Sequence, residues 1–426
     1  MFHHTIATSN SDLECGYPFV RFLSRQTLEL EGTVTRASSK SVEEYYVKIV
    51  DMKATPILLK AETVKLPTGQ LYPAGGTCLV EIKTDAGLTG IGESDAGGPW
   101  GEAFIAVKAF IEKAFKPLIL GEDPTNYRSL WDKIHDYSWY VDTGIGMSAL
   151  SGVDMALLDL AGKSEGVPAC KVLGGCYRNR VRPYASHPFI TPASYEEGIK
   201  DAVTQIEKGF TAVKMSFTKF PNFGENLNED IKYVKKVRDA IGYDIDLMIS
   251  DFAPPRPVSK AISMARRLEE FDLIFWEECL PRGDVEAYCQ LSAAVDLPIE
   301  AGEEMTNQML RYFIFRRAVD VINPDVTHIG GLSEAKKLAD LATAMGIKTY
   351  PHQFSSAVSM AANVHLVASM PDGDLCEYRT SYPDASMDEL LLKPLKFDKG
   401  YIEVPNAPGL GIELNKEVVE KIMWKC

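Results

Sequence analysis

Short apolar runs rich in β-branched residues alternate, from about residue 181 onward, with longer segments whose apolar residues recur at helical spacing. Helical stretches fill the gaps between these runs. One example is Leu332–Leu341, which follows Gly330 and Gly331, and Gly346 supplies the stop signal after it. This alternation is typical of parallel strands covered by helices, so the predicted fold class is α/β, a (β/α)7β TIM-type barrel. The strands predicted are Val181–His187, Ala212–Phe217, Asp244–Asp251, Leu273–Glu278, Leu297–Glu303, Val321–Asp325, Ile347–His352 and Asp374–Tyr378.

The pattern changes outside this region. Ile49–Lys60, Leu79–Thr84 and Gly90–Ser94 read as an antiparallel meander, and residues 100–170 are largely helical, including Ser148–Lys163. A second, α+β domain is therefore predicted. We divide the chain into an N-terminal extension without fold assignment (1–45), the α+β domain (46–180), the barrel (181–390) and a Gly-rich tail that returns to the α+β domain (391–426).

Composition narrows the choice of partner. The 426-residue chain carries a net charge of −14, which argues against nucleic acid or an anionic membrane as a partner and favours a small molecule. Its eight cysteines contain no C-x-x-C pair, so we expect reduced thiols in a cytoplasmic protein. We find neither a signal peptide nor eighteen consecutive apolar residues.

Three acids stand near the ends of consecutive predicted strands. Asp251, Glu277 and Glu303 are each separated by 26 residues, about one βα unit. Buried carboxylates need compensation, and carboxylates without His or Cys select a hard cation, with Mg²⁺ favoured over Ca²⁺. We therefore predict one Mg²⁺ bound by these acids. The alternative is that each acid caps the following helix, and Ser250 competes with Asp251 for the strand-three position.

A second group suggests proton transfer. Asp325 and His352 are 27 residues apart on neighbouring strands, so the carboxylate could orient the imidazole as a general base. Lys214 adds an inward cation on strand two, unless it snorkels outward. Glu377 on strand eight could donate a hydrogen bond to charge developing on the substrate, or form a structural salt bridge. His187 and His328 are further candidates for substrate binding, although each could be an ordinary loop histidine.

These motifs resemble the enolase superfamily, in its mandelate racemase/muconate lactonizing enzyme-like branch, over residues 50–415. The resemblance is carried by Phe275–Glu278, Ala301–Glu303, Asn323–Asp325 with Gly330-Gly331, and Pro351-His352. It implies a capping function for the α+β domain, Mg²⁺ at the three acids, His352 as the base, and Lys214 and Glu377 as catalytic and substrate-binding residues. We also expect a homo-oligomer.

Strand two departs from the racemase pattern. Racemases of this branch carry Lys-x-Lys there, whereas this chain has Lys214-Met215-Ser216 and so lacks a second base. With Glu277–Pro281 and Pro408–Asn415, this favours a resemblance to the L-rhamnonate dehydratase group of acid-sugar dehydratases. The expected reaction is dehydration of a sugar acid to a 2-keto-3-deoxy acid. The alternatives are a racemase, epimerase or cycloisomerase using the same ene-diolate, and a non-catalytic metal-dependent sugar-acid binding protein.

Overall fold

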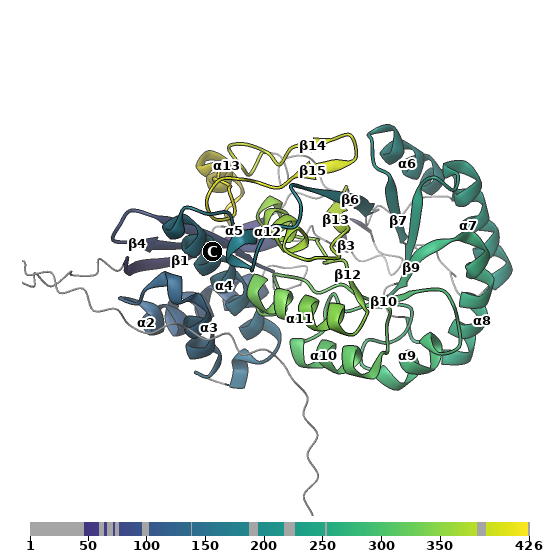
Figure 1. The fold of residues 1–426 in the computed structure, drawn as a ribbon, viewed down its shortest axis with the longest axis horizontal. Helices are drawn as coiled ribbons and strands as arrows, with labels where there is room; N and C mark the ends of the chain where they lie inside the picture. The colour runs from purple at the N-terminus through teal and green to yellow at the C-terminus, as the bar shows by residue number, and fades with distance from the viewer. Residues whose placement is uncertain are drawn as a thin grey trace, which may run out of the picture. The chain divides into compact units, whose positions relative to one another are not determined.

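Parallel strands and outer helices alternate through the second half of the chain, as the hydropathy pattern predicts (Figure 1). The computed structural model describes residues 47–58, 64–65, 71–72, 76–95, 102–137, 139–186, 195–216, 226–251, 254–380 and 389–424. The barrel strands are β6 Arg180–Ser186, β7 Ala212–Ser216, β8 Asp246–Ser250, β9 Leu273–Glu277, β10 Ile299–Ala301, β11 Val321–Ile322, β12 Lys348–Thr349 and β13 Leu375–Arg379. The helices are α6 Tyr195–Glu207, α7 Leu227–Ile241, α8 Val258–Leu268 (followed by a 3₁₀ turn, Glu269–Phe271), α9 Val285–Ser292, α10 Asn307–Arg316, α11 Leu332–Ala344 and α12 Ala357–Ala368.

The barrel strands pair in chain order from β6 to β12, and β13 returns to pair in parallel with β6. Between β12 and β13 the described residues form no hydrogen-bonded ladder. The (β/α)7β fold class is confirmed. The strand ends that carry chemistry in such barrels, the carboxyl ends, are also where the predicted site residues lie.

The α+β domain is built on a three-stranded antiparallel sheet of β1 Ile49–Leu58, β4 Gly76–Thr84 and β5 Thr89–Ser94. Its longest helix, α4 Gly144–Glu165, packs against β4 and β5 and ends at Gly166, whose φ of 69° suits glycine. The remaining elements are β2 Val64–Lys65, β3 Leu71–Tyr72, α1 Glu102–Ala109, a π-helical segment Phe110–Phe115, α2 Lys116–Ile119, 3₁₀ turns Pro124–Asn126 and Trp139–Val141, α3 Tyr127–His135 and α5 Ala169–Val172.

Helix α4 is long and apolar enough to cross a membrane by length and composition, but 89% of its most apolar window is buried within the protein. Apolar residues all round a helix are typical of a core helix as well as of a membrane span. Because α4 is buried between the sheet and neighbouring helices, its apolar composition is that of a core helix.

Buried acids of the α+β domain bind barrel loops. Asp154 of α4 accepts hydrogen bonds from the backbone N and the hydroxyl of Ser333, at the start of α11, with an N–O distance of 2.9 Å to the former. Glu93 of β5 accepts from the backbone N of Ser356 (2.9 Å) and of Ser359 (2.8 Å). Ser356 is the N-cap of α12 and Ser359 lies in its first turn, so each acid satisfies N–H groups at a helix start that lack partners within the helix. The α+β domain therefore fixes the loops after β11 and β12.

The tail contains β14 Phe397–Asp398, β15 Tyr401–Glu403 and α13 Lys416–Ile422. Strand β15 pairs antiparallel with β6. Further along, the backbone N of Leu410 donates to Asp159 of α4 (2.7 Å), and the backbone N of Trp424 donates to the Pro56 carbonyl (2.9 Å). The tail thus contacts both the barrel and the α+β domain.

One pair of cysteines departs from the expected free thiols. Cys170 and Cys176 form a disulfide that closes a six-residue separation. Gly174 and Gly175, with φ of 115° and 133°, allow the chain to double back between them. Cys78, Cys279, Cys289 and Cys376 are free, and Cys15 and Cys426 lie outside the described residues.

Candidate active site

The inner face of the barrel is identified by an apolar layer to which most strands contribute one residue: Tyr184, Ala212, Met248, Phe275, Val321, Tyr350 and Leu375. Side chains alternate along a strand, so residues two positions further on face the same way. Those positions hold Ser186, Lys214, Ser250, Glu277, Asn323, His352 and Glu377, which we call the polar layer. Polar side chains thus gather directly above an apolar floor.

Lys214 connects two acids of the polar layer. Its Nζ lies 2.6 Å from Oε1 of Glu277 and 2.7 Å from Oε1 of Glu377, and all three side chains are buried. Asn323 also donates from Nδ2 to Oε1 of Glu277 (2.9 Å). Burial lowers the pKa of Lys214, but the carboxylates, led by Glu277 and Glu377, outweigh burial and raise it. Lys214 is therefore a fixed ammonium in the site and does not snorkel outward.

His352 is oriented by Asp325, as the spacing predicts. Nδ1 lies 2.6 Å from Oδ2 of Asp325, whose other oxygen accepts from the backbone N and hydroxyl of Thr327. Nε2 faces Glu303 Oε2 at 3.4 Å and Glu377 Oε2 at 3.9 Å. Burial lowers the pKa of His352, but Glu377, Glu303 and Asp325 outweigh it and raise the pKa to about 10.

Asp325 itself is held ionised. Burial raises its pKa, but the hydrogen bond to His352 and the nearby His328 more than compensate, and the pKa falls to about 2. The carboxylate therefore accepts the Nδ1 proton and leaves Nε2 as the atom that exchanges protons. This arrangement can act as a base once Nε2 is deprotonated.

Glu377 behaves differently from the hydrogen-bond donor that we considered. Burial raises its pKa, but Lys214 and His352 outweigh burial and lower it, so the group is a carboxylate. Its Oε2 accepts from the backbone N of Gln353 at 2.9 Å. In this structure Glu377 accepts hydrogen bonds and supports Lys214 and His352.

The three predicted metal ligands do not converge. Glu303 lies beside His352 and also pairs with Arg282, its Oε1 being 2.9 Å from Nη2. Asp251 follows the inward-facing Ser250 and forms an ion pair with Arg256. Burial raises the pKa of Asp251 to about 7, although Arg256 opposes this. Strand three thus presents Ser250 to the site, in contrast to the choice of Asp251 made from spacing.

Of the two histidines predicted to contact the substrate, the structure describes one. His328 Nδ1 lies 3.2 Å from the Ser148 hydroxyl of α4, at the junction of the two domains. His187 lies outside the described residues. Sequence reasoning missed Arg282, Asn323 and the buried Glu300; for Asn323, its position two residues beyond Val321 was the available signal.

Two family models match the chain. A model described as "Enolase C-terminal domain-like" covers residues 198–418, and one described as "Mandelate racemase / muconate lactonizing enzyme, N-terminal domain" covers residues 47–174. The chain belongs to the enolase superfamily. Within it, the chain is of the mandelate racemase/muconate lactonizing enzyme-like type, and the α+β domain corresponds to the capping domain of that type.

Relatives in this superfamily include sugar acid dehydratases. An arabinonate dehydratase from Saccharolobus solfataricus is 31% identical over 81% of this chain and 90% of its own length. D-galactonate and D-xylonate dehydratases match at 29–30% identity. A D-galactarolactone cycloisomerase from Agrobacterium fabrum is 30% identical over 80% of this chain and 89% of its own length. Several relatives are therefore hydro-lyases by name, and one is an isomerase.

Solved structures in the superfamily share the fold. The 3,6-anhydro-D-galactonate cycloisomerase from Zobellia galactanivorans has a TM-score of 0.77 and 29% identity, covering 89% of this chain and all of that one. A racemase from Streptomyces coelicolor A3(2), solved with bound magnesium, has a TM-score of 0.77 at 24% identity, covering 88% and 100%. The second likeness concerns the fold.

The residues fit a magnesium ion with few protein ligands. Mg²⁺ is commonly held by one or two carboxylates, with water and substrate completing its shell. Glu277 and Glu303 face the site, and the buried amide oxygen of Asn323 has no hydrogen-bond partner among the described residues. No group of three His, Cys, Asp or Glu in the described part of the chain is already arranged to hold a metal. When bound, the ion would polarise a substrate carboxylate and weaken the hold of the acids on the His352 proton.

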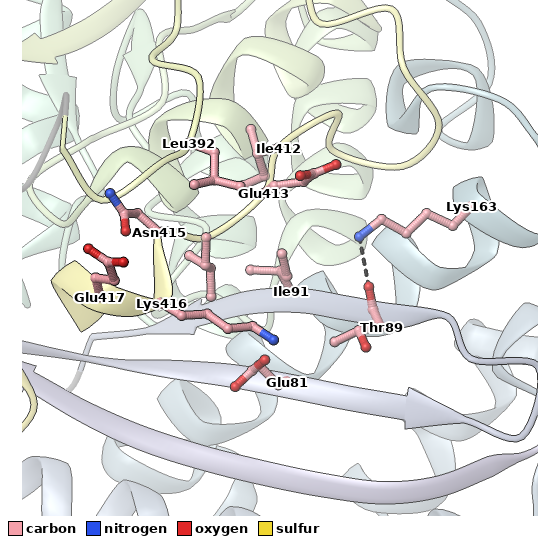
Figure 2. A pocket seen from close by; sticks show the side chains of 11 residues that line it. Glu81, Thr89, Ile91, Lys163, Leu392, Ile412, Glu413, Asn415, Lys416 and Glu417 are labelled. Atoms are coloured by element: carbon pink, nitrogen blue, oxygen red, sulfur yellow. Dashed lines mark hydrogen bonds between the residues drawn. The ribbon is translucent and has the colours of Figure 1, made fainter. Parts of the chain in front are cut away.

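A separate pocket of about 460 Å³ lies between the capping-domain sheet and the tail (Figure 2). It is lined by Thr89 and Ile91 of β5 and by residues such as Ile412 and Lys416 of the tail. Lys163, on its edge, donates to the Thr89 carbonyl at 2.7 Å. None of the predicted site residues lines this pocket, which is separate from the polar layer of the barrel.

Proposed function

We propose that the protein is a Mg²⁺-dependent dehydratase that converts a sugar acid, an aldonate or aldarate, into a 2-keto-3-deoxy acid. The observation that carries the proposal is an oriented base: His352, fixed by Asp325 at 2.6 Å, together with the buried ammonium of Lys214. The names of the dehydratase relatives support the substrate class. We further propose that the protein acts as a homo-oligomer.

The proposed reaction begins at the carbon next to the substrate carboxylate. His352 Nε2 takes the proton from C2, and the electron pair of the broken C–H bond moves toward the carboxylate to form an ene-diolate. Lys214 stabilises this charge, because an ammonium already fixed in a dry site need not reorganise as charge develops. Substrate binding by Lys214, Glu377 and His328 would orient C2 toward His352.

Elimination completes the reaction. The ene-diolate electron pair forms the C2–C3 double bond as the C3–O bond breaks, and the His352 imidazolium returns its proton to the departing 3-hydroxyl, which leaves as water. The resulting enol tautomerises to the 2-keto-3-deoxy acid. A single histidine can serve both proton transfers. On β7, Ser216 occupies the position where a second lysine would be needed for racemisation from the opposite face, and a serine is no base at neutral pH.

A cycloisomerase is the second candidate, because two cycloisomerases are among the similar proteins. Incubating the enzyme with Mg²⁺ and a panel of mono- and diacid sugars, followed by semicarbazide, distinguishes the reactions. We expect semicarbazone formation, absent in His352→Asn. Deuterium incorporation at C2 without water loss would instead show a racemase or epimerase, and lactone rearrangement without water loss would show a cycloisomerase. Binding of Mg²⁺ and sugar acids without any turnover would favour a non-catalytic binding protein.

A further inference from the structure

Glu300 is a buried acid for which the proposed proton transfers have no use. It lies in the middle of β10, its exposed fraction is 0%, and neither carboxyl oxygen has a hydrogen-bond partner among the described residues. A desolvated carboxyl group without a partner is costly, and native proteins rarely keep one without a ligand or a buried water. The position of Glu300 therefore calls for an occupant.

Strand register places Glu300 beside the active-site acids. It pairs with Glu277 of β9 on one side and with Val321 of β11 on the other, and partners in a parallel ladder share a face of the sheet. Val321 belongs to the apolar layer inside the barrel. Glu300 consequently points into the barrel next to Glu277, and Glu303 follows three residues later, just after β10 ends.

The neighbouring strand lacks the acid that a three-carboxylate site would need. Ser250 of β8 is the register partner of Glu277, so the inward row across β8, β9 and β10 reads Ser250, Glu277, Glu300. Asp251 is committed to Arg256. The carboxylate missing from β8 is thus present on β10, on the other side of β9.

We propose that Glu300 is a ligand of the divalent cation, together with Glu277 and Glu303, and that Asp251 is not. The inference rests on the Mg²⁺ dependence of the proposed function. The ion at this site would be a hard cation, because Glu277, Glu300 and Glu303 all offer oxygen acceptors. When ionised, the site would hold five buried carboxylates, those of Glu277, Glu300, Glu303, Asp325 and Glu377, beside the basic groups of Lys214 and His352. Arg282 also pairs with Glu303 but is shared with Glu278 and Glu304. The site would therefore carry an excess of negative charge, which a divalent cation would offset.

The test titrates Mn²⁺ into the metal-free full-length protein and measures binding as the loss of the EPR signal of free Mn²⁺. It examines this ligand set without any need for turnover. We expect Glu300→Gln to weaken Mn²⁺ binding by at least about tenfold. Asp251→Asn is the matched control at a buried acid and should leave the dissociation constant within about twofold. The double variant S250D/E300Q, which returns the carboxylate to β8, should recover binding. Circular dichroism melts establish that each variant is folded.

Mn²⁺ binding by Glu300→Gln equal to that of the wild type would overturn the proposal and leave Glu300 as the partner of a buried water. Loss of binding in Asp251→Asn would restore the three acids chosen from spacing and would also overturn it. If Glu300→Gln does not fold, Glu300→Asp provides the test, since a carboxylate withdrawn by one methylene should bind Mn²⁺ more weakly. A wild type that binds no Mn²⁺ but still dehydrates a sugar acid in EDTA would refute this ligand set while leaving the dehydratase itself intact.

Discussion

His365, on α12, provides a prediction of how stability depends on pH. Its ring is fully buried: Nδ1 accepts from the backbone N of Cys170 at 3.3 Å, and Nε2 lies 3.2 Å from the Leu410 carbonyl, to which it donates. One nitrogen must accept and the other must donate, so the neutral ring fits both partners and the protonated ring fits only one. Protonation would break the contact that joins α5 to α12.

The magnitude follows from the pKa. Burial lowers the pKa of His365 to about 4, although the Leu410 carbonyl opposes this, whereas an exposed histidine titrates near 6.5. Because the unfolded chain binds this proton first, stability is unaffected above about pH 6.5 and falls as pH drops from 6.5 to 4. At about 1.4 kcal/mol per pH unit, the full loss is about 3 kcal/mol, of which about 2 kcal/mol falls between pH 7 and pH 5.

The assay compares urea unfolding midpoints at pH 7 and pH 5 for the wild type and His365→Gln. Glutamine can accept and donate in similar positions but does not titrate, so the variant should lack the His365 share of the pH dependence. The comparison between variants is essential, because buried acids act in the opposite direction; burial raises the pKa of Asp154 to about 6. His135→Gln, at a partly exposed histidine of α3, is the matched control. Parallel pH dependences for the wild type and His365→Gln would refute the reasoning.

Three further predictions concern the site and its supports. Lys214→Met should abolish turnover and lower the free energy of unfolding by about 3–5 kcal/mol, because it strands buried carboxylates; a variant of wild-type stability in urea would contradict the pairing. Asp325→Asn should reduce kcat by roughly 10³–10⁴-fold and move the acidic limb of the kcat–pH profile to lower pH, since Asp325 raises the pKa of His352; an unshifted limb would argue against this role. Glu93→Gln should cost about 1–3 kcal/mol in thermal unfolding, more than Ser356→Ala, which leaves the Glu93 carboxylate in place; equal effects would show that the hydroxyl dominates.

The barrel and the Asp325–His352 pair could be predicted from the sequence because both depend on the spacing of one βα unit. However, the spacing between strands does not determine which of two neighbouring residues points inward, and the third barrel strand, β8, is an example. Leu247, Met248 and Ile249 are all buried, so the run is apolar on both faces and contains no alternation from which to read which residues point inward. Only the contacts of Met248 with the inner apolar layer reveal that Ser250, and not Asp251, follows it on that face.

Glu300 and Arg282 escaped prediction for different reasons. Glu300 sits between two apolar residues of a short strand, a pattern that equally indicates a strand with one solvated face. Arg282 lies in a loop, and its contact with Glu303 depends on how the chain turns after β9, where Glu278 adopts a positive φ of 48°. Neither local propensity nor periodicity specifies such a turn.

The hydrogen bonds that Asp154 accepts from Ser333 and that Glu93 accepts from the start of α12 also bear on how this architecture can diverge. Residues that hold the catalytic loops are encoded some 180 to 260 positions away from those loops. A capping domain exchanged for that of a relative would keep the barrel loops in place only if both acids came with it. Modular recombination at the boundary between the domains is therefore constrained by two buried carboxylates of the capping domain.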